Sequence, residues 1–246
     1  RTREGYKPPA YLVSKACLEG FYYKPRIDKK LLHGRGGGLI GLSACLGGEV
    51  PQTIRRKGVK KAVEVAKEYA EVLEPGSFFL ELQQNRLSEQ QEVNDGLIKI
   101  AKQTGLGLVC TNDCHYLDRA DAKAHDILLC VQTQSTVDDE NRMRHTVDEF
   151  YLKSPEEMED AFAHVPQALE NAASIADSCN VELTLGENYL PIFQVPEGYD
   201  RPRYLAKLAH DGLNERFEEQ GVPEEEWQSY RERLDRELGV INDMDF

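Results

Sequence analysis

The chain has 246 residues, 40% hydrophobic and 30% charged, which is enough apolar material for the buried core of one large domain or of a domain with an appendage. No apolar run approaches the roughly 18–20 residues that cross a bilayer, so no membrane association is expected. The net charge of −13 argues against this segment being the main surface that grips nucleic-acid phosphates, because that grip needs clustered Lys and Arg.

The first half of the chain alternates between helical and strand patterns. A helix is predicted over residues 10–20. Three short apolar runs that read as buried strands then alternate with two amphipathic helices. This order predicts a parallel sheet with right-handed crossovers, either open or closed into a barrel. Because three strands cannot close a barrel, we expect an incomplete α/β barrel whose remaining strands lie upstream. The predicted strands are 39–44, 78–83 and 106–111, and the helices between them are 58–73 and 88–104.

The second half is dominated by helices. A polar loop at 134–145 and a short extended segment at 149–152 follow the first of them. A proline-punctuated stretch, LPIFQVPEGYDRP, then predicts a domain boundary. We therefore divide the chain into an α/β part over residues 1–190, a linker over 191–202 and an all-α part over 203–246. The predicted helices of this half are 122–133, 155–163, 166–179, 203–219 and 223–243.

Functional side chains in parallel α/β folds gather where strands end. The first predicted strand ends at Cys45 and the third leads into Asp113 and His115, whose alternate spacing on extended chain lets both face one site. A thiolate, a carboxylate and an imidazole form a ligand set for zinc, and the last two suit manganese or iron. The alternatives are a loop-capping Asp beside a surface His, and a Cys that is simply a small buried side chain.

The other cysteines and histidines give weaker signals. None of the six cysteines forms a CxxC pair, which favours a reducing, cytoplasmic compartment over a disulfide framework. Cys114 is expected to point away from Asp113 and His115, and His125 to pack or to cap a helix. No phosphate-binding glycine loop is present. Core positions are predicted for Cys110, Cys130 and Cys179, and surface positions for His33, His145, His164 and His210.

Eight stretches follow one another in a specific order along the chain. They are LEGFYYKPRID at 18–28, GLIGLSACLGGEVPQ at 38–52, FFLELQ at 78–83, TNDCHYLDRADAKAHDILLCVQT at 111–133, FYLKSPEEM at 150–158, ALENAASIADSCNVEL at 168–183, YLPIF at 189–193 and YRERLDRELGVINDM at 230–244. As a series in this order they are highly specific, they cover nearly the whole chain, and they resemble the alpha subunits of bacterial DNA polymerase III.

The resemblance implies the later part of a PHP domain, a distorted barrel with a multi-metal site at its strand ends, followed by the helical start of the polymerase region. Cys45, Asp113 and His115 fall on positions of that family's metal ligands, with zinc or manganese as the expected metal. The family's upstream ligands and its polymerase aspartates are expected to lie outside this chain. The chain alone is therefore expected to be inactive, and magnesium is expected as the metal of the parent polymerase.

The implied function is DNA-directed DNA synthesis in bacterial replication, with DNA, deoxynucleotides, the sliding clamp and other replisome subunits as partners. Within this function the PHP part is either a 3′–5′ exonuclease that proofreads or a non-catalytic scaffold that docks a separate proofreading subunit. A stand-alone PHP-type metal-dependent phosphoesterase is the alternative from another class, although such an enzyme has no use for the helices at 203–243.

Overall fold

The computed structural model describes residues 1–187 and 191–244, which form two compact units, Arg1–Leu183 and Thr184–Phe246. Residue 190, the predicted end of the α/β part, lies outside the described residues, as do the first two residues of the YLPIF stretch. The predicted boundaries of the linker therefore stay a prediction.

The first unit is built on a three-stranded parallel sheet that does not close on itself. Its strands are β1 (Gly41–Leu42), β2 (Phe78–Gln83) and β3 (Gly107–Thr111), in the spatial order β1-β2-β3. Leu42 pairs with Phe79, and Leu80 pairs with Leu108. This open parallel sheet confirms the predicted incomplete barrel, although β1 is much shorter than the run predicted at 39–44.

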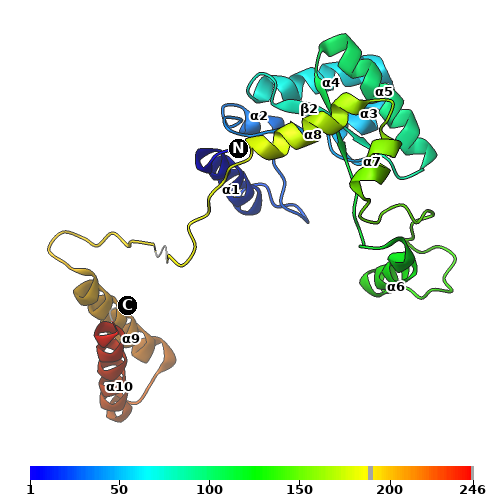
Figure 1. Cartoon of the computed structure of the whole chain (residues 1–246). Helices are drawn as coiled ribbons and strands as arrows, with labels where there is room; N and C mark the ends of the chain where they lie inside the picture. The colour runs from blue at the N-terminus through cyan, green and yellow to red at the C-terminus, as the bar shows by residue number, and fades with distance from the viewer. Residues whose placement is uncertain (188–190, 245–246) are drawn as a thin grey trace. The chain divides into compact units, whose positions relative to one another are not determined.

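Helices cover one face of this sheet and enclose the core (Figure 1). They are α3 (Glu49–Lys57), α4 (Val59–Val72), α5 (Ser88–Thr104) and α8 (Pro166–Ser178). Alternate residues of a strand face opposite sides, so β2 presents one set of its side chains to these helices. The fully or almost fully buried members of the core include Val50, Ala62, Ala66, Phe78, Leu80, Leu82, Val93, Leu97, Ile100, Phe162 and Ala168.

The N-terminal helix begins earlier than the predicted 10–20. Helix α1 spans Arg3–Leu18, and the side chain of Thr2 caps it by accepting a hydrogen bond from the Gly5 amide at 3.1 Å. An N-cap of this kind satisfies one of the free amides of the first turn, which explains the earlier start. Pro8 and Pro9 lie inside the helix. A single-turn helix, α2 (Lys29–Leu32), follows.

A long connection leaves the end of β3 and returns to α8. It contains the 3-10 turn η1 (Arg119–Asp121), α6 (Ala122–Thr133) and α7 (Pro155–Ala161). The His115 amide donates to the Phe150 carbonyl at 2.7 Å, and Tyr116 forms a parallel bridge with Tyr151. These contacts close the loop at its base, and α6 lies apart from the sheet (Figure 1). We call residues 112–153 the 112–153 segment.

The second unit contains α9 (Arg201–Gln220) and α10 (Glu224–Asp243), which pack against each other. The Trp227 ring stacks on Phe217 with centroids 4.9 Å apart, and its indole N–H donates to the Val222 carbonyl at 2.9 Å. Both helices lie within one or two residues of their predicted bounds. None of the described helices has the length and apolar character needed to span a bilayer.

Candidate metal site at the strand ends

A buried carboxylate ties the ends of the three strands together. Glu81 on β2 accepts a hydrogen bond from the Ala44 amide at 3.0 Å and another from the Thr111 hydroxyl at 2.5 Å. Its own amide donates to the Ser43 hydroxyl at 2.8 Å. Ala44 has a φ of 62°, a left-handed conformation that is uncommon outside glycine. The Glu81 contact therefore fixes the strained turn that leads into Cys45.

The three residues predicted as metal ligands fall into two places. Asp113 Oδ1 and His115 Nε2 are 3.2 Å apart, and each side chain is about one-third exposed (33% and 36%). Cys45 is exposed on the turn after β1. Within residues 1–187 and 191–244, no hydrogen bond or ion pair joins Cys45 to this pair. The set of Cys45, Asp113 and His115 therefore remains a prediction.

A cluster of three histidines surrounds His115. One ring atom each from His115, His125 and His145 lies within 4.8 Å of the others. The ring centroid of His115 is 5.5 Å from that of His125 and 5.1 Å from that of His145. The rings of His125 and His145 stack with their centroids 5.5 Å apart. These residues come from the chain after β3, from α6 and from the loop after α6. We call them the histidine cluster.

The surface position predicted for His145 is wrong. This side chain is half-buried and packs on Phe150, with ring centroids 4.4 Å apart. Burial lowers the pKa of His145 below its ordinary value, and the neighbouring His115 and His125 lower it further. His125, predicted to pack or cap, does pack against the other two rings. The three histidines are 10 to 30 positions apart in the sequence, and no spacing rule links residues at these separations, so the cluster could not be predicted from a local pattern.

An ion pair holds the loop that carries His145 against α6. Arg142 donates to both carboxylate oxygens of Asp126, at 2.6 and 2.7 Å, which is a two-pronged arrangement of the strong kind. This hydrogen bonding lowers the pKa of Asp126. Gln134, the C-cap that follows helix α6, has a left-handed conformation (φ 54°), which turns the chain back. His125 and Asp126 both line the same cavity, so the ion pair lies close to the histidine cluster.

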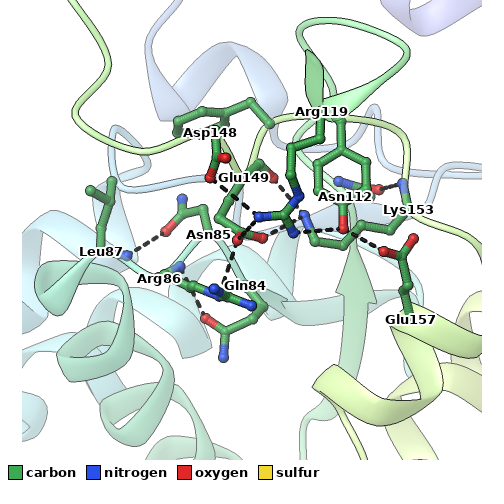
Figure 2. A network of polar contacts seen from close by, with 12 residues as sticks. Gln84, Asn85, Arg86, Leu87, Asn112, Arg119, Asp148, Glu149, Lys153 and Glu157 are labelled. Atoms are coloured by element: carbon green, nitrogen blue, oxygen red, sulfur yellow. Dashed lines mark hydrogen bonds and ion pairs between the residues drawn. The ribbon is translucent and has the colours of Figure 1, made fainter. Parts of the chain in front are cut away.

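The base of the 112–153 segment is held by a second polar network (Figure 2). Glu149, only 4% exposed, forms ion pairs with Arg86 at 3.0 Å, Arg119 at 2.9 Å and Lys153 at 3.6 Å. Arg119 also donates to the Tyr151 hydroxyl at 3.0 Å. Three cations around one buried carboxylate satisfy its charge, as a buried ion requires. Sequence reasoning gave Glu149 no role.

A cavity of about 570 Å³ lies between the two networks. Its walls combine basic, acidic and imidazole groups, so it suits a polar ligand better than an apolar one. The residues that line it include Arg86, Tyr116, Lys123, His125, Asp126, His145, Asp148 and Glu149.

Of the three cysteines predicted to lie in the core, two are buried in the structure. Cys110 and Cys130 are buried, and burial raises the pKa of the Cys110 thiol to about 11. The core position predicted for Cys179 is wrong, because this residue follows the last turn of α8 as its C-cap and is exposed. Cys114 is exposed as well.

The chain is similar to a known domain family and to several curated proteins. The PHP domain model matches residues 1–85. The chain is 40% identical, over its whole length, to DNA polymerase III subunit alpha of Helicobacter pylori strain J99, and 39% identical over its whole length to that of Treponema pallidum. It is 41% identical to the Thermus aquaticus subunit over 87% of its length. The resemblance to the polymerase III alpha subunits is confirmed.

The chain spans about a fifth of the length of these curated alpha subunits, with 22% of the H. pylori protein and 21% of the T. pallidum protein covered. The PHP match includes β1, β2 and Cys45, which supports the prediction of an incomplete PHP-type barrel. Asp113, His115 and the rest of the histidine cluster lie after the matched range.

Proposed function

We propose that this chain works as part of a DNA-directed DNA polymerase, the polymerase III alpha subunit of bacterial replication. The observation that carries the proposal is the similarity to the H. pylori and T. pallidum subunits over the entire chain, including α9 and α10. A stand-alone phosphoesterase would not need that helical unit. The proposal includes DNA, deoxynucleotides, magnesium, the sliding clamp and other replisome subunits as partners, and a cytoplasmic location.

We propose further that the PHP region is a metal-binding scaffold. The fit of zinc or manganese rests on Asp113 and His115, whose carboxylate and imidazole are already in contact. Cys45 adds a thiolate if the turn held by Glu81 brings it to the same site. A metal bound there would polarise a phosphate oxygen and supply hydroxide at neutral pH.

The polymerase proposal is tested with the full-length protein. Primer extension on a primed DNA template, with magnesium and four deoxynucleotides, is expected to give templated products, and adding a bacterial sliding clamp is expected to lengthen them. Absence of extension by a folded full-length protein, as judged by circular dichroism, would contradict the proposal. Release of phosphate from small phosphate esters in its place would favour the phosphoesterase.

Proofreading and scaffolding are separated by a double variant, Asp113→Asn with Cys45→Ser. If the PHP region is a 3′–5′ exonuclease, the variant loses the shortening of a mismatched, 3′-labelled primer and keeps primer extension. If the region is a scaffold, the variant changes neither reaction. Cys17→Ser is the matched control, since Cys17 is also exposed but lies on α1. Metal content measured on the same samples shows whether loss of activity follows loss of metal.

A further inference from the structure

We propose that residues 20–27, which connect α1 to α2, form a binding site for single-stranded DNA, with bases stacked on aromatic rings and phosphates held by cations. We call these residues the 20–27 loop. The proposal rests on the proposed polymerase function, because a polymerase copies an unpaired template strand. It adds a contact surface for that strand, made of residues that the candidate metal site does not include.

Three consecutive aromatic side chains of the loop are exposed. Phe21 and Tyr22 are each 64% exposed, and Tyr23 is 83% exposed. The connection between α1 and α2 extends away from both helices as a narrow loop (Figure 1), and every residue from 21 to 28 is exposed. Large apolar side chains that gather on a surface indicate a site of interaction. Exposed ring faces are what unpaired bases stack on, with little dependence on sequence.

A tight turn in the backbone holds these rings outward. The Tyr22 amide donates to the Lys24 carbonyl at 3.2 Å, and Tyr23 between them has a φ of 59°. A left-handed conformation at a bulky residue costs free energy, and such residues cluster at functional sites. The two ends of the loop lie against each other, because a Cβ on Gly20 would be only 2.0 Å from the Arg26 carbonyl oxygen.

The rings and the cations of the loop form one continuous surface. The rings of Tyr22 and Tyr23 meet edge to face with their centroids 4.7 Å apart, and the Arg26 guanidinium lies 5.1 Å from the centroid of Tyr22. Among the residues that the structure describes, neither Lys24 nor Arg26 forms an ion pair. Both charges are therefore available to a phosphate, and the rings beside them to the adjoining bases.

The acidic residues that flank the loop already have partners. Glu19 forms an ion pair with Lys15, and Asp28 caps α2 by accepting a hydrogen bond from the Leu31 amide at 2.9 Å. Within the described parts of the chain, no ion pair joins either carboxylate to the cations of the loop. A basic, aromatic surface on a chain of net charge −13 favours a polyanion whose bases can stack over a protein partner.

The test uses the full-length protein and a single-stranded oligothymidylate that carries 5-iododeoxyuridine, which cross-links under ultraviolet light to aromatic rings stacked on it. Peptide mass spectrometry is expected to place cross-links on Phe21, Tyr22 or Tyr23. No cross-link in the loop would overturn the proposal, whether the protein leaves the oligonucleotide unbound or binds it elsewhere. That is the result expected if another part of the chain or another subunit covers the loop.

A charge variant keeps the rings as targets for cross-linking. Lys24→Gln with Arg26→Gln should lower the cross-linking of the loop on the order of tenfold at about 0.1 M salt. The slope of log binding against log salt should fall by about 1.4, since two lost phosphate contacts contribute about 0.7 each on a single strand. Arg56→Gln with Lys60→Gln, two exposed cations of α3 and α4, is the matched control. Equal cross-linking in both variants would overturn the proposal.

A ring variant tests the stacking. Tyr22→Ala with Tyr23→Ala is expected to weaken oligonucleotide binding, measured by fluorescence anisotropy, on the order of tenfold. Tyr6→Ala removes another exposed tyrosine, from α1, and should bind as the unchanged protein does. Equal binding by the two variants, both folded by circular dichroism, would overturn the proposal. Primer extension by the unchanged protein without cross-linking of the loop would overturn this site alone and leave the polymerase proposal standing.

Discussion

The first unit combines two regions that are held together by different forces. The sheet and its helices, from β1 to α5 with α8, are joined by apolar side chains such as Leu80 and Leu97, which are fully buried. The 112–153 segment is fastened by charged groups, above all Glu149 and the Asp126–Arg142 pair. Apolar burial tolerates small shifts, whereas these hydrogen bonds require fixed directions. The segment that carries the histidine cluster is therefore positioned by directional contacts.

The largest expected effect on stability comes from removing a buried side chain from the core between the sheet and its helices. Leu80→Ala should lower the free energy of unfolding of the first unit by about 3 kcal/mol, because it removes a fully buried side chain and leaves a cavity. Urea unfolding followed by far-ultraviolet circular dichroism measures the change. Leu128→Ala on α6, where the side chain is 51% exposed, is the matched control and should change little. An equal loss in both variants would mean that the two regions are not distinct.

The second effect is on the stability of the 112–153 segment alone. Glu149→Gln should destabilise the 112–153 segment by about 2 kcal/mol, since it leaves Lys153, itself 5% exposed, beside an uncharged group. Solvent reaches Arg86 and Arg119, which limits the cost. Hydrogen exchange should become faster in 112–153 while β2 and α5 keep their protection. Faster exchange throughout the sheet would contradict this division.

Two thiols four residues apart mark the boundary between the regions. Cys110 on β3 is buried with its pKa raised to about 11, so at pH 8 only on the order of one molecule in a thousand carries a thiolate there. Cys114, at the start of the 112–153 segment, is exposed. Iodoacetamide labelling at pH 8, read by peptide mass spectrometry, should modify Cys114 long before Cys110. Comparable labelling rates would show that the end of β3 opens readily.

The smallest effect is a change in acid sensitivity at α7. The Tyr151 hydroxyl, and after it the Ser154 amide, donate to Glu157 and hold its pKa below the ordinary 4.5. Because the pKa of Glu157 is lower in the folded than in the unfolded protein, its ionised form stabilises the fold at pH values above the ordinary pKa. That stability is lost as the pH falls through the lowered pKa of the folded protein. Glu157→Gln should therefore flatten the stability profile between about pH 5 and pH 3. Thermal unfolding across that range measures it, with Glu159→Gln, an exposed position of the same helix, as the comparison.

Local patterns predicted the apolar region well. Strand β2 and helix α5 begin and end at the predicted residues, because the periods of strands and helices show in consecutive side chains. Helix α3 was missed: Pro51 lies at its third position, where a missing N–H breaks no helical bond, so the proline is compatible with a helix the pattern did not suggest.

The site was predicted only in part, for a physical reason. Asp113 and His115 are two residues apart on extended chain, so the sequence alone suggested that they face one site, and the structure has Asp113 Oδ1 and His115 Nε2 3.2 Å apart. Their role as metal ligands stays a prediction. The contacts of His145 and Glu149 join residues brought together by folding, and no spacing rule encodes them. Cys179 looked like part of an apolar helix face, but the helix ends one residue before it.

The β-bridge between Tyr116 and Tyr151 holds the two ends of the 112–153 segment together, so the segment can vary in length without moving its ends. Where the two ends of a loop are already fastened together, the entropy of closing it grows only with the logarithm of its length. Residues added to the polar loop at 134–141, before Arg142, would therefore cost little, and the strands beneath would keep their register. Length variation among relatives is expected to concentrate there, leaving β3 and α8 the same distance apart.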